Sequence, residues 1–223
     1  MNLSIEQQKV IDFIAVETFT TIPMLKFLLG KKHVQSCYSL INNLVSKKLI
    51  RKELIPLLTY NSITLVGITN QGLAFAKEFN RFATSKTFQK SKVSISTLQH
   101  KLDIQYFHIL TSFSGWSHWK DGSELGKRNK EQKVPDAVVV TPQKSTIALE
   151  VEREIKSIRR YRDILLSHLV SRKNGYWNSI IYLCPNLQQA KSLKAKFYSI
   201  KSLQFNGQVI SLNDSHYEAF QFY

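Results

Sequence analysis

The sequence predicts a chain of mixed α+β and α/β class, in which a helical N-terminal domain with one β-hairpin precedes an α/β domain. Three observations support this prediction. The first 80 residues combine apolar stripes at helical spacing with two β-branched runs that a polar turn separates. Residues 81–94 are polar and basic. From residue 95 onward, helical patterns alternate with short apolar runs, which is typical of a sheet flanked by helices.

Composition indicates a protein with a real core and a polyanionic partner. The 223 residues are 43% hydrophobic, and the net charge is +15, spread along the whole chain. Such an excess of positive charge favours nucleic acid as the partner. Cys37 and Cys184 lie in apolar patterns, so we expect buried free thiols. Because no signal-peptide pattern and no apolar run of about 18 residues occurs, we expect a soluble, cytoplasmic protein without a membrane partner.

The order of elements in the first 80 residues favours a winged helix-turn-helix. Helical stripes predict helices at residues 4–16, 22–29, 31–46 and 69–79, and β-branched runs predict strands at residues 49–55 and 63–68. Ser4 is placed to cap the first helix, and Pro23 falls in the first turn of the second, where proline is tolerated. Three helices followed by a hairpin are typical of a winged helix over residues 1–80.

The exposed face of the third helix carries short polar side chains that suit base edges and phosphates. From this helix and the residues just before it, we expect DNA contacts by Lys31, Lys32, Gln35, Ser36, Ser39, Asn42 and Asn43. The alternative is a winged helix that contacts protein and never touches DNA. Residues 81–94 are expected to be a basic linker that lies along a phosphate backbone, or else a plain solvated connector.

Residues 95–223 predict a sheet with flanking helices. Helical patterns cover residues 95–110, 157–171 and 187–198, and apolar or β-branched runs predict strands at residues 113–119, 138–140, 146–152, 179–184 and 208–212. A charged loop at residues 121–133 lies between the first two of these strands. The alternation of helices and strands is typical of an α/β domain.

The stretch from Val134 to Arg160 contains the residues that we expect to carry chemistry. Side chains alternate along a strand, so Glu150 and Glu152 point the same way, and a hairpin brings Asp136 opposite them. Three carboxylates on one patch repel one another unless a cation or protons neutralise them. A hard divalent ion with oxygen ligands, Mg²⁺ or Mn²⁺, is the expected solution. The alternative is three exposed carboxylates at strand ends.

Basic residues follow these carboxylates closely. Lys156, expected one turn into the next helix, is placed to add positive charge to the site. Residues that can neutralise a phosphate or contact the flanking DNA backbone are Arg153, Arg159 and Arg160, with ordinary surface charge as the alternative. Glu124 and His100 are further possible site residues. The alternatives for these two are a solvated loop acid and a structural histidine.

This arrangement resembles the Pro-Asp … (Asp/Glu)-x-Lys core of the restriction-endonuclease-like nucleases, with Glu152 standing where that pattern has lysine. Over most of its length the chain resembles the replication-relaxation family, which includes the MobC/TraX-type plasmid relaxases. The residues that carry the resemblance are Leu98-Gln99-His100-Lys101-Leu102, Val134-Pro135-Asp136-Ala137-Val138, Ala148-Leu149-Glu150-Val151-Glu152-Arg153, Tyr161 and Leu183-Cys184-Pro185.

The resemblance implies a winged helix coupled to a restriction-endonuclease-like domain, binding at a specific site near an origin of transfer or replication and nicking of one strand. The leading hypothesis is therefore a metal-dependent DNA endonuclease or nickase that works with relaxosome or replication proteins. Asp136 and Glu150 would be metal ligands, Glu152 would bind the metal or orient the attacking water, and Lys156 would assist. A monomer suffices to cut one strand, and a homodimer would cut both. The alternatives are an inactive DNA-binding accessory or regulator and a defence nuclease with the same core.

Overall fold

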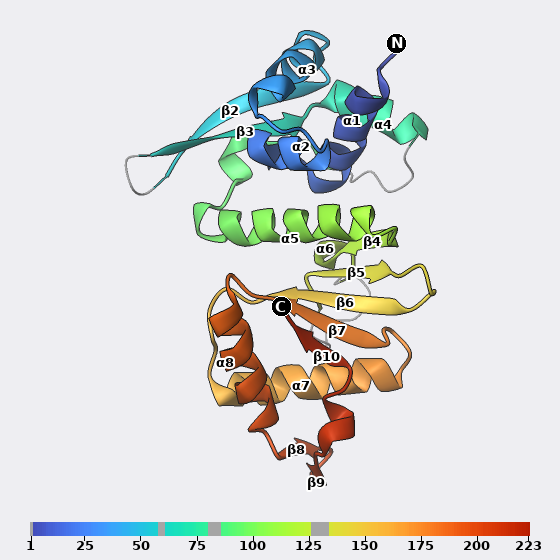
Figure 1. Cartoon of the computed structure of the whole chain (residues 1–223), viewed down its shortest axis with the longest axis vertical. Helices are drawn as coiled ribbons and strands as arrows, with labels where there is room; N and C mark the ends of the chain where they lie inside the picture. Colours follow the sequence, from blue (N-terminus) through green and yellow to red (C-terminus); the bar gives the residue numbers. More distant parts are fainter. Residues whose placement is uncertain (1, 58–60, 80–85, 126–133) are drawn as a thin grey trace. The chain divides into compact units, whose positions relative to one another are not determined.

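The computed structural model describes residues 2–57, 61–79, 86–125 and 134–223, and these form helices and β-sheets in two compact units (Figure 1). The first unit is Met1–Ile109 and the second is Leu110–Tyr223. The predicted mixed class, with α-helices and β-sheets in the same chain, is confirmed. Among the helices in the described ranges, none is both long and apolar enough to cross a lipid bilayer.

The first unit packs helices on a small antiparallel sheet. Its elements are α1 (Ile5–Glu17), β1 (Phe19–Thr21), α2 (Ile22–Leu28), α3 (Gln35–Ser46), β2 (Ile50–Pro56), β3 (Ser62–Ile68), α4 (Asn70–Phe79), the short 3₁₀ turn η1 (Lys90–Lys92) and most of α5 (Ile95–Phe113). The strand order is β1-β3-β2. Strand β1 lies between the first two predicted helices and was not itself predicted, because its three residues become a strand by pairing with β3, far away in the sequence.

Local capping explains where the first helices begin. Ser4 caps α1 as expected and forms a capping box with Gln7, and Thr21 caps α2 by accepting the Met24 N–H. Helix α3 begins at Gln35 rather than at Lys31. The physical reason is that the Lys31 N–H donates back to the carbonyl of Lys26, which closes the end of α2.

The segment after α4 belongs to the first unit and is not merely a linker. Residues 80–85, including Arg81, lie outside the described residues. Phe88 is only 2% exposed, and its ring packs against Phe19 with 5.6 Å between centroids. Its N–H donates to the carbonyl of Ile68 at 3.0 Å. Gly67 makes room for Phe88, because a Cβ there would lie 2.1 Å from the Phe88 Cγ.

Helix α5 also contacts the first unit through a polar face. Glu17 of α1 is buried, with its two carboxylate oxygens 3.0 Å from Lys101 Nζ and 2.7 Å from His108 Nδ1. Gln105 accepts from the Thr20 hydroxyl at 2.8 Å and donates to the carbonyl of Phe19 at 2.6 Å. The chain therefore divides between Ile109 and Leu110, and not at residue 95 where the sequence placed the start of the second domain.

The second unit is a five-stranded mixed sheet with helices. Its elements are β4 (Ser117–Asp121), α6 (Gly122–Leu125), β5 (Ala137–Val140), β6 (Thr146–Val151), α7 (Ile158–Lys173), β7 (Ser179–Leu183), α8 (Leu187–Tyr198), β8 (Ser202–Phe205), β9 (Gln208–Ser211), η2 (Asp214–His216) and β10 (Phe220–Phe222). The strand order is β10-β7-β6-β5-β4. Strands β6, β7 and β10 run parallel, and β4, β5 and β6 are antiparallel neighbours. Side chains of α7 and α8 share a buried apolar cluster with this sheet.

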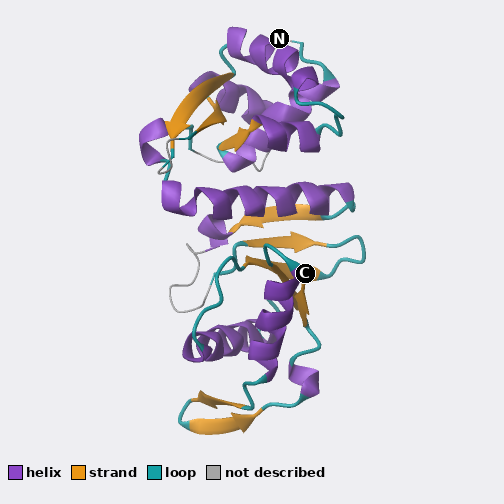
Figure 2. Ribbon diagram, turned by 60° about the vertical axis from the view of Figure 1, so that its left-hand side comes forward, coloured by secondary structure: helices purple, strands orange, loops and turns teal. Residues whose placement is uncertain are grey.

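Two strand predictions in the second unit were wrong, one in its sheet and one in its first residue. The run at residues 208–212 becomes β9, which pairs with β8 in a separate hairpin and does not enter the main sheet (Figure 2). The outer strand of the main sheet is β10, which pairs with β7 and lacked a clear pattern because it is three residues long. Strand β4 starts at Ser117 rather than at residue 113, because α5 continues to Phe113.

Candidate functional site

The ends of β5 and β6 bring Asp136 opposite Glu150. Ala137 pairs with Leu149, so the antiparallel register places the preceding residue, Asp136, across from Glu150. One carboxylate oxygen of Asp136 accepts the backbone N–H of Val151 at 2.7 Å. The Asp136 carbonyl accepts the Gly122 N–H at 2.8 Å. A Cβ on Gly122 would lie 2.3 Å from the carbonyl oxygen of Pro135, so glycine permits this close approach.

Glu150 is buried and held by a histidine from α7. Its side chain is nearly inaccessible, and one carboxylate oxygen lies 3.1 Å from Nε2 of His168, which is fully buried. The imidazole lies among the rings of Trp177, Tyr182 and Phe220, with centroid distances of 5.7, 6.3 and 6.0 Å. The three aromatic rings restrict the orientation of the imidazole beside the Glu150 carboxylate. His168 was not predicted as a site residue, because a single helical histidine gives no sequence signal for this contact.

Glu152 is also buried and forms an ion pair with Lys156. The sequence placed Lys156 in the helix, but it lies two residues before α7 begins, in the segment between β6 and α7. Its N–H donates to the Tyr161 hydroxyl at 3.0 Å, and its carbonyl accepts from Lys196 Nζ of α8 at 2.8 Å. Burial raises the pKa of Tyr161, and the charge of Glu152 contributes to the same shift. Glu150 therefore contacts a residue of α7, and Glu152, just after β6, contacts a residue that precedes α7.

Tyr182 of β7 is the second site residue that the sequence did not reveal. It pairs with Glu150 in the parallel register of β6 and β7 and is 1% exposed. Within the described part of the chain, no hydrogen-bond partner contacts its hydroxyl. Burial raises the pKa of Tyr182 well above its usual value, and the nearby charges of Glu150, Glu152 and Asp136 raise it further. All three predicted carboxylates therefore lie close enough to Tyr182 to affect its pKa.

Each of the three carboxylates contacts a different protein group, namely the Val151 N–H, His168 or Lys156. Within the described ranges, no three His, Cys, Asp or Glu side chains are grouped so that they hold an ion directly. Their donor set nevertheless matches Mg²⁺ or Mn²⁺, because all three side chains offer carboxylate oxygens. The unpartnered buried hydroxyl of Tyr182 adds a polar atom to the same neighbourhood. The contacts with the Val151 N–H and with Lys156 each engage one oxygen of a carboxylate that has two, so they compete with an ion for Asp136 and Glu152 without excluding it.

The other predicted residues of this region lie on its surface. Arg159 and Arg160 are exposed in the first turn of α7, where Ser157 caps the helix through the Arg160 N–H at 3.3 Å. Arg153 is half-buried, and its carbonyl accepts from the Gln189 side chain at 3.3 Å. Glu124 is exposed on the four-residue helix α6, while residues 126–133 of the predicted loop lie outside the described residues.

His100 lies on the part of α5 that belongs to the first unit, whereas the three carboxylates lie in the second. Its predicted role at the site remains a prediction.

The first unit presents the predicted polar face on α3. Apolar residues of this helix, Cys37, Ile41 and Leu44, enter the core of the unit, and the opposite face is exposed. The exposed predicted residues are Lys32, Gln35, Ser36, Ser39, Asn42 and Asn43. Lys31 is half-buried and forms an ion pair with Glu6.

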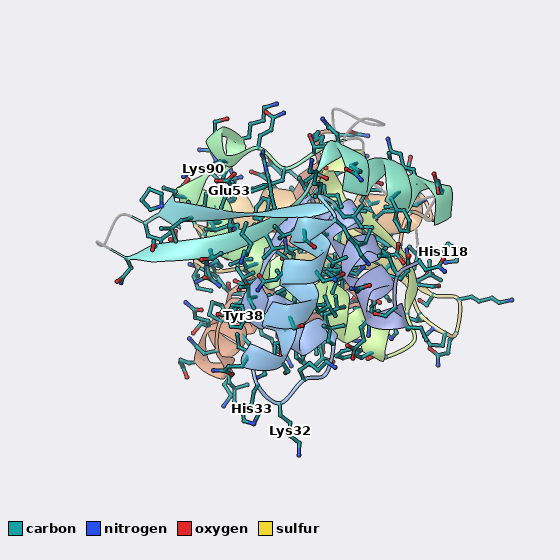
Figure 3. The ribbon with its side chains drawn as sticks, turned by 90° about the horizontal axis from the view of Figure 1, so that it is seen from above. Lys32, His33, Tyr38, Glu53, Lys90 and His118 are labelled. Carbon is teal, nitrogen blue, oxygen red and sulfur yellow. The ribbon has the colours of Figure 1, made fainter. Side chains whose placement is uncertain are left out.

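The sequence missed two residues on this surface. Tyr38 is 43% exposed on α3, and Figure 3 shows it together with Lys32 and His33 of the preceding turn. Lys52 of β2 donates to the Asn42 Oδ1 at 2.9 Å. Apolar spacing alone does not reveal that Tyr38 is exposed, because either Tyr38 or the neighbouring Cys37 could occupy the core position.

Comparison with known proteins finds no family model that matches this sequence. Neither a curated protein nor a solved structure matches it. The resemblance to the replication-relaxation family therefore remains a prediction.

Proposed function

We propose that this chain is a metal-dependent DNA endonuclease that nicks duplex DNA at a specific site. The observation that carries the proposal is the placement of Asp136, Glu150 and Glu152 at the adjoining ends of β5 and β6, beside Lys156. Glu150 and Glu152 are buried, which costs free energy for charged side chains, and binding a catalytic cation is one function that would account for this cost.

Each residue has a role that follows from its position. Asp136 and Glu150 would hold Mg²⁺ or Mn²⁺, and His168 would keep the Glu150 carboxylate oriented. The bound cation would supply a more acidic water and stabilise charge on the phosphate and the leaving oxygen. Glu152 would orient the attacking water or complete the ligand set. Lys156, once released from Glu152, would stabilise negative charge on the scissile phosphate.

DNA binding would come from the first unit and from surface charge. The order α1-β1-α2-α3-β2-β3, with the sheet order β1-β3-β2, supports a winged helix with α3 as its recognition helix. The first unit has fourteen Lys and Arg against six Asp and Glu, and the second has seventeen against ten. Exposed Arg159 and Arg160 would contact the backbone near the carboxylates. We propose an origin on a plasmid or other mobile element as the target, with relaxosome or replication proteins as partners.

One observation favours a second candidate, a DNA-binding accessory without nuclease activity. Each of the three carboxylates already has a protein partner, namely the Val151 N–H, His168 or Lys156. Such a set of contacts can stabilise a fold without any metal. In that case the first unit would bind DNA and the second would serve for docking to other proteins.

The test is nicking of supercoiled plasmid DNA that carries the native locus of the gene, with Mg²⁺ or Mn²⁺. Glu150→Gln removes the charge while keeping the shape of the side chain. Glu154→Gln is the matched control, because Glu154 is an exposed acid four residues away on the same segment. We expect open circles from the wild type and Glu154→Gln but not from Glu150→Gln. Equal nicking by all three proteins would contradict the proposed site. No nicking by any of them, with a specific band shift from all three, would favour the accessory.

A further inference from the structure

The exposed face of α3 carries two asparagines whose amide orientations are set by neighbouring residues. The Asn42 Oδ1 accepts from Lys52 Nζ at 2.9 Å. An ammonium group can only donate, so the oxygen of this amide must face β2. The Nδ2 group, which donates, therefore points away from Lys52.

A longer chain of hydrogen bonds orients Asn43. The backbone N–H of Ser4 donates to the Gln7 Oε1 at 3.1 Å in the capping box of α1. A backbone N–H is always a donor, so this contact identifies the oxygen of the Gln7 amide and leaves its Nε2 as a donor. That Nε2 donates to the Asn43 Oδ1 at 2.8 Å. The Asn43 oxygen is thus engaged by α1, and its Nδ2 is the atom left for a ligand.

The surroundings of these two amides favour an electron-rich partner. Both asparagines are exposed, and among the described residues no acceptor contacts either Nδ2 group. Helix α3 contains no Asp or Glu. Lysines precede and follow it in the sequence, at Lys31, Lys32, Lys47 and Lys48. The face therefore offers hydrogen-bond donors and positive charge, which suits a nucleic acid, because its backbone is anionic and its base edges carry acceptors.

We infer that α3, if it binds duplex DNA as proposed above, selects guanine through the Nδ2 donors of Asn42 and Asn43. In the major groove guanine presents two acceptors, N7 and O6, whereas cytosine presents a donor. Adenine is read by an amide that accepts from N6 and donates to N7, which needs a free Oδ1. Because Lys52 and Gln7 engage both Oδ1 atoms, that reading is disfavoured here. Thymine presents a single acceptor, O4, beside its methyl group, whereas guanine presents two acceptors, so guanine is the better match for an amide group that only donates.

The experiment is selection of bound sites from a randomised duplex library by the full chain without divalent metal, which prevents cleavage. Asn42→Asp and Asn43→Asp each replace the outward donor by an acceptor and retain an oxygen for Lys52 or Gln7. Asn206→Asp is the charge-matched control, because Asn206 is exposed in the turn between β8 and β9 of the second unit. Lys52→Met is a fourth variant, which frees the Asn42 amide to turn over.

We expect a wild-type site with guanine at two positions. Each Asp variant should lose guanine at one of them, gain cytosine there and bind the original site about 5- to 150-fold more weakly. Lys52→Met should admit adenine at the position that Asn42→Asp changes, and Asn206→Asp should keep the wild-type site.

A preferred site without these guanines would overturn the inference while leaving specific DNA binding intact. The same conclusion follows if the Asp variants lose affinity for all sequences equally, since that would be phosphate repulsion alone. The absence of any preferred sequence would overturn both the inference and site-specific binding.

Discussion

Phe88→Ala tests whether the segment after α4 is part of the folded first unit. The ring is 2% exposed and packs with Ile55, Leu65, Leu98 and Leu102 in one apolar cluster. The Arg51 guanidinium lies over it, 5.3 Å from the centroid. A solvated connector would make none of these contacts.

The expected loss of stability is large. Truncation of a buried phenylalanine to alanine lowers the free energy of unfolding by about 3–5 kcal/mol. With a urea dependence of about 2 kcal/mol per M, the midpoint of unfolding should fall by roughly 1.5–2.5 M. The backbone hydrogen bond between the Phe88 N–H and the Ile68 carbonyl remains possible in the variant, so the loss is mainly one of packing.

The assay is urea unfolding of the full chain, and unfolding of the first unit is measured by hydrogen exchange and mass spectrometry on its peptides. This choice separates the units, because Trp116, Trp119 and Trp177 all lie in the second and their fluorescence follows only that unit. Leu54→Ala is the control, since this β2 side chain is 57% exposed. If Phe88→Ala changed the first unit by less than about 0.5 kcal/mol, as surface substitutions do, the packing argument would be refuted.

Three further predictions concern buried polar groups. Burial alone would raise the pKa of Glu17, but Lys101 and His108 outweigh it and lower the pKa below 4.5; the ion cluster therefore stabilises the fold above that pH and is lost as pH falls through the lower folded value. Glu17→Gln should destabilise the first unit by roughly 2 kcal/mol, which is less than the loss of a fully buried ion pair because Lys101 is 27% exposed. In a plot of the urea midpoint against pH, the variant should show a flatter acid limb than the wild type. An unchanged acid limb would contradict a lowered pKa of Glu17 in the folded state. Burial raises the pKa of Cys184 to about 11, and the charge of Glu152 adds to this shift. This thiol should therefore react with a disulfide reagent near pH 8 only after denaturation. Fast reaction of the native protein would contradict the burial of Cys184. His168→Ala should weaken Mn²⁺ binding, measured by calorimetry, about 10- to 100-fold because His168 positions Glu150, with partial rescue by His168→Asn. Unchanged affinity would refute this positioning role of His168.

Part of the candidate site was visible in the sequence because it depends on strand alternation and hairpin pairing. Glu150 and Glu152 are two residues apart, and Asp136 precedes the partner strand, so their common neighbourhood follows from the period of a strand. His168 and Tyr182 were not visible. They come from α7 and β7, and only the packing of that helix and that strand against β6 places them beside Glu150.

By itself the sequence determined most helices and the two hairpins β2-β3 and β5-β6, since these depend on local periodicity, on caps such as Ser4 and on turn residues. The tertiary structure decided where these elements belong. Pairing with distant partners turned residues 19–21 into β1 and residues 220–222 into the outer strand β10, and kept β9 out of the main sheet. It also assigned Phe88 and most of α5 to the first unit, through contacts with residues 20 to 91 positions away. These outcomes depend on which surfaces meet in three dimensions, and local sequence patterns carry no record of that choice.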